Sequence, residues 1–187
     1  MITAKPNAYI DCLWFISPLF ESEEHRLDMI IGVIGGQDNA SAGAKKMAEE
    51  VGRLIAESGA KLICGGMEGV MEAACRGAKK AGGITIGILP TGSKADANPY
   101  VDIPIVTAMG TARNVIIVRS ADALIAIDGS YGTLSEIAHA LDQGKRVVSL
   151  KSWPLRKAGV AKDLLVEVST PEEAVRLALR YARAGSS

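Results

Sequence analysis

The sequence is poor in the residues on which several classes of protein depend. Aromatic residues make up only 4% of its 187 residues, and there are three cysteines and two histidines. Cys12, Cys64 and Cys75 show no CxxC spacing, which argues against a disulfide scaffold or a structural zinc site. His25 and His139 are far apart in the sequence, so we expect no metal centre built on histidine. The composition favours a protein of the reducing cytoplasm with no resident metal.

The sequence also lacks an excess of charge of one sign and a long apolar segment. Lys and Arg together number 21, as do Asp and Glu, so no overall positive field attracts nucleic acid or an anionic membrane. The apolar stretch 12–20 contains Pro18, is too short to span a bilayer and follows Asp11 rather than a positive segment. Neither a membrane partner nor a secretory signal is therefore expected. A small anionic ligand is compatible with this composition, because it needs only a local positive potential.

The first 28 residues differ from the rest of the chain. The apolar stretch 12–20 is followed by the charged stretch ESEEHRLD, residues 21–28, and Met29 then opens the first clear strand pattern. We therefore predict an N-terminal extension over residues 1–28, either poorly ordered or a translated leader. An apolar strap packed on a partner surface is the alternative. The remaining residues, 29–187, are long enough and apolar enough for a single α/β domain.

From Met29 onwards, short apolar runs alternate with amphipathic stretches. Strands that alternate with helices predict a Rossmann-like, doubly wound α/β fold with a mainly parallel sheet and helices on both faces. Pro104 places its strand near an edge of the sheet. The expected strands are 30–34, 61–64, 84–89, 103–106, 123–127, 147–150 and 164–168, and the expected helices are 41–58, 69–80, 111–120, 134–141 and the stretch that follows Thr170.

Glycines gather in the loops that follow the expected strands. In such folds ligands lie at the carboxyl ends of the strands, so these loops form one candidate surface. Glycine lets a backbone approach a ligand closely, and its repeated use at one edge favours binding over turn geometry alone. The absence of GxGxxG and GxxxxGK[ST] argues against a dinucleotide fingerprint and a P-loop. The candidate binding residues in these loops are Gly35, Gly36, Gly65, Gly66, Glu68, Gly69, Thr91 and Gly92.

The loop after the 123–127 strand is the most informative of these loops. It reads DGSYGTLSE over residues 128–136, and a helix follows at once. Backbone N–H groups at a helix start have no intrahelical partner and lie at the positive end of the dipole, which suits a phosphate. The structural alternative makes Thr133 the helix N-cap and Glu136 its capping-box partner. The candidate binding residues here are Gly129, Ser130, Tyr131, Gly132 and Thr133.

Two motifs resemble the signature segments of a known superfamily. GSYGTLSE, residues 129–136, is similar to the PGGxGTxxE signature of the Lonely Guy phosphoribohydrolases and their relatives, formerly labelled lysine decarboxylases. CGGMEGVMEAA, residues 64–74, is similar to their GGGxxGLM segment, and the order and spacing of the two motifs match. Over residues 29–150, including GTARNVIIVRSADALIAIDGSYGTLSEIAHAL, the chain most resembles the branch that contains the molybdenum cofactor carrier proteins.

The resemblance implies a phosphate on the signature loop and, in the hydrolases, cleavage of an N-glycosidic bond by an arginine and acidic groups. Arg113 and Glu136 match these positions and are the candidate catalytic residues, and Arg113 and Asn114 also join the candidate binding residues. Asn114 stands where the family commonly has lysine, and Ser135 where it often has an acid. These losses weaken the case for hydrolysis more than for binding, because phosphate binding needs only N–H donors, a hydroxyl and an arginine.

The leading hypothesis is a cytoplasmic carrier or storage protein for a phosphate-bearing nucleotide or a pterin-type ligand such as the molybdenum cofactor. The enzymatic alternative is a nucleoside 5′-monophosphate phosphoribohydrolase, and the third is an assembly or regulatory protein stabilised by a nucleotide. Residues 115–118 are four consecutive apolar residues in the expected 111–120 helix, and they cannot all face one sheet. A second copy of the chain would cover the apolar residues of this helix that do not face the sheet, so a homodimer or tetramer is expected.

Overall fold

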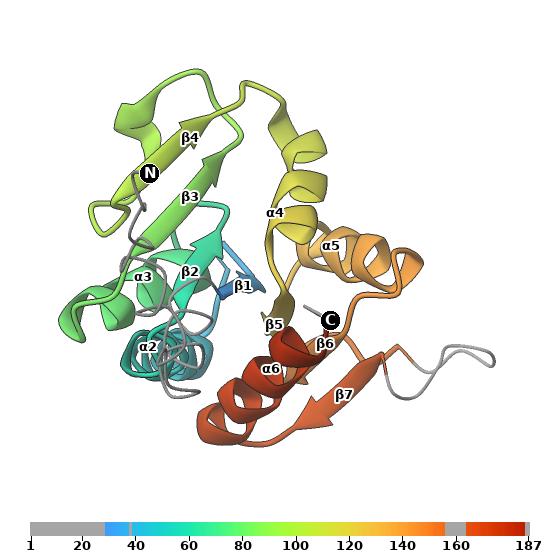
Figure 1. Cartoon of the computed structure of the whole chain (residues 1–187). Helices are drawn as coiled ribbons and strands as arrows, with labels where there is room; N and C mark the ends of the chain where they lie inside the picture. The colour runs from blue at the N-terminus through green and yellow to red at the C-terminus, as the bar shows by residue number, and fades with distance from the viewer. Residues whose placement is uncertain (1–28, 38, 156–163, 186–187) are drawn as a thin grey trace, which may run out of the picture.

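The computed structural model describes residues 29–37, 39–155 and 164–185 (Figure 1). The predicted extension over residues 1–28 lies outside this part of the chain. Within it, no helix has the length and apolar character needed to cross a lipid bilayer.

Seven strands form one sheet in the described part of the chain, and every neighbouring pair is parallel. The order is β4-β3-β2-β1-β5-β6-β7, so the chain moves outwards from β1 to one edge and then returns to β5 beside β1. This is the predicted doubly wound arrangement, and β4, with Pro104, lies at an edge. The strands are β1 (Ile30–Gly35), β2 (Lys61–Cys64), β3 (Thr85–Leu89), β4 (Ile103–Val106), β5 (Ala123–Ile127), β6 (Val147–Leu150) and β7 (Leu165–Val168).

Helices cover both faces of the sheet (Figure 1). One face packs against α2 (Ala42–Glu57), α3 (Val70–Lys80) and α6 (Pro171–Gly185), and the other against α4 (Asn114–Ser120) and α5 (Tyr131–Asp142). Successive side chains of a strand point to opposite faces, and both faces are buried here, which explains why the central strands are continuous apolar runs.

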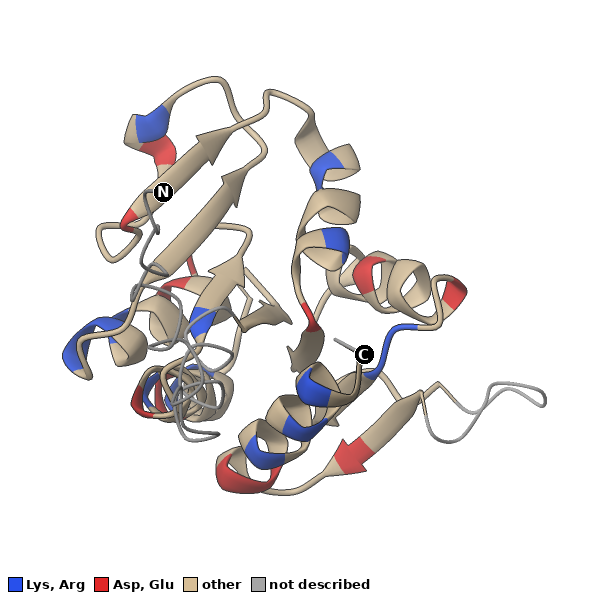
Figure 2. Cartoon of the chain, viewed as in Figure 1, with Lys and Arg blue, Asp and Glu red and all other residues tan. Residues whose placement is uncertain are grey.

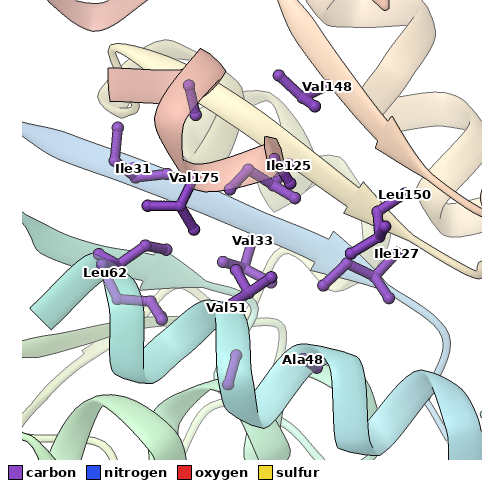
Figure 3. Close-up of a cluster of buried hydrophobic side chains, with 14 of the residues drawn as sticks. Ile31, Val33, Ala48, Val51, Leu62, Ile125, Ile127, Val148, Leu150 and Val175 are labelled. Carbon is purple, nitrogen blue, oxygen red and sulfur yellow. The ribbon is translucent and has the colours of Figure 1, made fainter. Parts of the chain in front are cut away.

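The core shows this alternation in β1. Ile31 and Val33 are fully buried and pack with Val51 of α2 and Val175 of α6 (Figure 3), whereas Ile34 belongs to the cluster beneath α4 and α5. The two apolar layers hold the carboxyl ends of β1, β2 and β5 at the same end of the sheet, and the loops that follow them therefore meet.

Two helix starts differ from the prediction. Gly129, with a φ of +139°, turns the chain directly after β5, so α5 begins at Tyr131 with Ser130 as its N-cap. Thr133 is therefore not the N-cap, and Glu136 accepts a hydrogen bond from Arg113, so the capping-box alternative is wrong. The predicted 111–120 helix divides into the 3₁₀ turn η2 (Gly110–Arg113) and α4.

Candidate functional site

A cleft of about 250 Å³ opens at the carboxyl ends of the central strands, where the strand order reverses between β1 and β5. Ligands of open α/β sheets bind at this point. The walls come from the loops after β1, β2 and β3, from η2 and the start of α4, and from the first turns of α5. Besides Val33 and Ile34 of β1, the lining residues are Gly35, Gln37, Gly65, Met71, Pro90, Gly110, Thr111, Arg113, Asn114, Ser130, Gly132, Thr133 and Glu136.

The structure brings part of the predicted site together in this cleft. The predicted residues that line it are Gly35, Gly65, Arg113, Asn114, Ser130, Gly132, Thr133 and Glu136. The predicted residues that lie around it without lining it are Gly36, Gly66, Glu68, Gly69, Thr91, Gly92, Gly129 and Tyr131.

The residues outside the lining have other surroundings. Gly36 holds two loops together, because its carbonyl accepts the N–H of Val70 at the start of α3 (2.9 Å). Tyr131 is 83% exposed and stacks on Trp153, with 6.1 Å between ring centroids, and Glu68 is exposed. Thr91 differs from these, because its Oγ1 atom is buried without a hydrogen-bond partner although the residue does not line the cleft.

Sequence reasoning missed Gly110 and Thr111 among the lining residues, and it singled out no role for Gln37 within the candidate loop 35–37. Gln37 follows the Gly35-Gly36 pair at the end of β1, and the rule that selected those glycines could have included it. Gly110 and Thr111 belong to η2, one turn before Arg113, and their position depends on the 3₁₀ turn that the sequence did not indicate.

Arg113 and Glu136 form a buried ion pair inside the cleft. Their Nη1 and Oε1 atoms are 3.3 Å apart, and their side chains are 9% and 8% exposed. Burial raises the pKa of Glu136 to about 7, against the opposing effect of Arg113. Burial also lowers the pKa of Arg113, but a guanidinium stays charged at neutral pH. The cleft thus holds a permanent cation beside a carboxyl group poised between its two protonation states.

Two buried polar atoms of the cleft residues have no hydrogen-bond partner in the structure. They are Nε of Arg113 and Oγ1 of Thr133. Leaving a buried donor or acceptor unpaired costs about 1–3 kcal/mol, so such atoms are rare unless a ligand or water completes them. The N-cap of α5 also makes no side-chain hydrogen bond to the first turn. A hydroxyl, a guanidinium and the N–H groups of a helix start therefore face one space, and these are the groups that bind phosphate.

Two glycines shape this space in opposite ways. A Cβ on Gly65 would lie 2.3 Å from Nη2 of Arg113, so only glycine lets the guanidinium lie across the end of β2. A Cβ on Gly132 would meet nothing closer than 3.9 Å, so this glycine leaves the first turn of α5 open. One glycine positions the cation, and the other keeps the backbone accessible beside it.

Asn114 joins the cation to the start of α5. Its Oδ1 accepts a hydrogen bond from Nη1 of Arg113 (2.7 Å), and its Nδ2 donates to Oγ of Ser135 (3.0 Å) and to the carbonyl of Gly132 (3.4 Å). The two positions that depart from the resembled family pattern, 114 and 135, are thus in contact with each other. They form a neutral hydrogen-bonded pair.

Comparisons with known proteins identify the family and the fold of the chain. The model of the SLOG cluster4 family matches residues 28–178. The structure of the molybdenum cofactor binding protein from the phototrophic bacterium Rippkaea orientalis is 42% identical, with a TM-score of 0.76, and covers 80% of this chain and 94% of that one. The structure of the Moco carrier protein from Chlamydomonas reinhardtii is 36% identical, with a TM-score of 0.75, and covers 84% of this chain and 98% of that one.

A more distant relative is a probable cytokinin riboside 5′-monophosphate phosphoribohydrolase of Oryza sativa subsp. japonica. It is 29% identical over 110 residues, which are 57% of this chain and 45% of that protein. The chain therefore spans less than half the length of that relative. Together, these comparisons confirm the resemblance that the two motifs indicated, both to the superfamily and to its carrier branch.

Proposed function

The chain belongs to the SLOG cluster4 family, and from this premise we propose that it carries or stores the molybdenum cofactor, or a closely similar phosphate-bearing pterin. The support is twofold. The two solved relatives, which match most of this chain, are named for binding or carrying that cofactor. The observation that carries the proposal is the set of buried, unpartnered donors and acceptors in a cleft at the start of α5.

The phosphate is assigned to the first turn of α5. There the backbone N–H groups of Gly132 and Thr133, the hydroxyl of Thr133 and the guanidinium of Arg113 converge on one wall of the cleft. The positive end of the helix dipole adds to the charge of the arginine. The residues present therefore fit a phosphate without a metal ion as an additional partner.

The ring of the ligand is assigned to the part of the cleft next to this phosphate position. Its walls are the glycine backbones at the ends of β1 and β2 and the side chains of Met71 and Pro90. Ligand pockets are lined mainly by apolar groups, with a few polar groups that fix orientation, and this cleft has both parts. The glycine backbone lets a flat ring lie close to the sheet.

Binding without turnover is the expected outcome, although the rice relative favours hydrolysis as the second candidate. A carboxyl group with a pKa of about 7 is suited to general acid catalysis. However, Glu136 is the only carboxylate among the described residues that line the cleft, whereas glycoside hydrolysis commonly uses two. The neutral Asn114–Ser135 pair supplies no second acid.

The test is to offer the protein the molybdenum cofactor and a panel of nucleoside 5′-monophosphates. Calorimetry measures binding, and chromatography measures free base and ribose 5-phosphate. We expect the cofactor to bind and no free base to form. Release of free base, abolished by Glu136→Gln, would instead assign the protein to the hydrolases. Binding of a nucleoside 5′-monophosphate without turnover, and without binding of the cofactor, would favour the assembly or regulatory hypothesis. Binding of neither ligand class would contradict the proposal.

We further propose that α4 contributes to an interface between two copies of the chain. Ile117 and Val118 are fully buried within the subunit, whereas Val115 and Ile116 are only partly buried. Two of the four apolar residues in the run 115–118 are thus fully buried within the subunit, and the other two are left partly exposed.

The neighbouring edge of the sheet supports this interface. Ile103 and Ile105 of β4 are 47% and 43% exposed, and they pair in register with Ile86 and Ile88, which belong to the cluster beneath α4. They therefore lie on the same face of the sheet as α4, and grouped exposed apolar residues of this kind mark protein contacts. Sedimentation of the full chain should give a dimer or a larger species, and a monomer at micromolar concentration would contradict the interface.

We also propose that the protein is cytoplasmic. The sulfur atoms of Cys64 and Cys75 are 3.5 Å apart and not bonded to each other. Disulfides persist in oxidising compartments, so two adjacent free thiols support a reducing one.

A further inference from the structure

A second hollow, of about 440 Å³, lies at the opposite end of the sheet from the cleft. It is formed where β5 and β6 begin and where α4, α5 and α6 end, and we call it the amino-end pocket. The length of β5, at about 3.3 Å per residue, separates its level from that of the cleft by roughly 13 Å. One small ligand cannot occupy both places.

The charged lining of the amino-end pocket is mostly positive. Arg119, Lys145 and Arg146 line it, with Asp122 as the only carboxylate among the described residues that do so. Figure 2 shows basic segments on α4, on the turn before β6 and on α6 along this side of the molecule. This local excess occurs in a chain whose formal net charge is zero.

Two of the charged residues have structural roles. Oδ2 of Asp122 accepts the backbone N–H of Ile30 at 2.7 Å. Nζ of Lys145 donates to the carbonyl of Val118 at 2.6 Å and to that of Ala121. Asp122 thus fixes the start of β1, and Lys145 caps the end of α4. Their opposite charges also offset each other, so the charge left in the pocket is that of the two arginines.

Arg119 and Arg146 have no ion pair within 4.0 Å in the part of the chain that the structure describes. Some surface arginines are paired, since Arg53 contacts Glu50 and Arg76 contacts Glu49, whereas Arg119, Arg146 and the arginines of α6 make no ion pair among the described residues. The amino-end pocket differs from these positions because two unpaired guanidiniums line the same hollow. Each offers a planar set of N–H donors that matches a carboxylate or a phosphate.

The position of Arg146 is also preorganised. Its guanidinium carbon lies over the ring of Tyr181, 4.8 Å from the centroid, and that of Arg180 lies 5.6 Å from the same centroid, so contact with the ring restrains Arg146. Basic residues near helix C-termini often only offset the helix dipole, and Lys145 at the end of α4 does so. That explanation does not cover Arg146, because it lies outside the helices, between α5 and β6.

We propose that the amino-end pocket binds a small dianion of the phosphate monoester or dicarboxylate class between Arg119 and Arg146. The two arginines supply the charge and the paired donors, and Tyr181 fixes one of them. This second site is independent of the proposed cofactor function, since the cleft and its residues take no part in it.

The test is calorimetric titration of the full chain with two probes, inorganic phosphate and succinate. Phosphate should show two classes of site. Arg119→Ala and Arg146→Ala should each weaken binding to the amino-end pocket by about tenfold or more, because hydrogen bonds to charged groups are lost. Gly132→Asp should remove only the binding of phosphate to the cleft. Arg176→Ala is the matched control, since Arg176 is an exposed arginine of α6 outside the lining.

The two probes distinguish the ligand classes. In the Gly132→Asp variant, which lacks the cleft site, phosphate binding without succinate binding supports a phosphate monoester, and succinate binding without phosphate binding supports a dicarboxylate. Arg146→Lys keeps the charge and loses the paired donors, so it should weaken binding less than Arg146→Ala while preserving the fold. The proposal is overturned if the Gly132→Asp variant, which lacks the cleft site, binds neither probe, or if the Arg119 and Arg146 variants bind both probes as Arg176→Ala does.

Discussion

Two arginine–glutamate pairs in this protein have the same chemistry and opposite pKa shifts. On the surface between α2 and α3, Arg76 and Glu49 are 2.8 Å apart, with side chains 30% and 29% exposed. In the cleft, Arg113 and Glu136 are 3.3 Å apart and more than nine-tenths buried. Hydrogen bonds from Arg76 and then Lys80 lower the pKa of Glu49 to about 2, whereas burial raises that of Glu136 to about 7.

The difference between the pairs is access to solvent. Water stabilises both charges of the surface pair, which contributes about 0–1 kcal/mol to folding. The buried pair loses that hydration, and its attraction at 3.3 Å does not fully replace it. A buried ion pair is therefore weak support for stability, and an oxyanion bound to Arg113 would complete its hydrogen bonds. The surface pair serves the fold, and the buried pair is suited to a ligand.

The largest contrast is expected when each arginine is removed. Arg113→Ala deletes the phosphate contact and leaves Glu136 buried without a counter-charge, so ligand affinity should fall at least about 100-fold. Stability should fall by about 3 kcal/mol at pH 8, and less at pH 5, where Glu136 is protonated. Arg76→Ala should cost about 1 kcal/mol or less and spare binding. Calorimetry and urea denaturation measure both effects, and equal behaviour of the two variants would refute the distinction.

A negative charge added at the start of a helix gives a second test of the difference between the cleft and the surface. Gly132 and Gly43 each lie two residues after a serine N-cap, on α5 and α2, and a Cβ at either would meet nothing closer than 3.9 Å. Asp at this helix position is compatible with the dipole, so both variants should fold. Gly132→Asp should abolish ligand binding through repulsion, whereas Gly43→Asp should leave it unchanged. Loss of binding in both variants, or in neither, would remove the first turn of α5 from the site.

The pH dependence of stability should have opposite signs for the two glutamates. The folded pKa of Glu136, about 7, exceeds its ordinary value of 4.5, so its contribution is present below pH 4.5 and is lost as the pH rises through 7. The loss is on the order of 3 kcal/mol. Glu49 behaves in reverse, losing a small contribution as the pH falls towards 2.

Urea denaturation between pH 5 and 8 tests this difference. Glu136→Gln should remove most of the decline in stability that the unmodified protein shows as the pH rises. Glu49→Gln is the matched control and should keep that decline. An unchanged decline in Glu136→Gln would mean that the carboxyl group titrates below this range.

The smallest effect is expected at Asn114. Asn114→Ala removes the acceptor that holds Nη1 of Arg113 and the donor that holds Ser135, so ligand affinity should fall about fivefold. Ser135→Ala removes only the second contact and should have less effect. Calorimetry with the same ligand compares the two, and a larger loss in Ser135→Ala would show that Asn114 does not position the arginine.

Much of the fold could be predicted because both faces of the sheet are buried. Ala123–Ile127 is apolar at every position, so it reads as a central strand without ambiguity, and Pro104 identifies an edge. The meeting of Gly35, Gly65 and Gly132 at one cleft also follows from the sequence, because the carboxyl ends of parallel strands share one end of the sheet.

The direction of individual side chains could not be predicted in the same way. It depends on the residue at which α5 begins, and the sequence favoured a later start, with Thr133 as the cap. With the observed start, Thr133 and Glu136 line the cleft, while Tyr131 is 83% exposed and does not line it. The pKa of Glu136 likewise arises from tertiary burial, which no local pattern encodes.

The most direct test of the central claim is a site-specific NMR titration of the carboxyl groups of Glu136 and Glu49, with and without inorganic phosphate. Without phosphate, Glu136 should titrate near pH 7 and Glu49 near pH 2. Bound phosphate places negative charge beside Arg113, so the midpoint of Glu136 should rise further, and that of Glu49 should stay where it was. A Glu136 midpoint near its ordinary value of 4.5, unmoved by phosphate, would contradict the account.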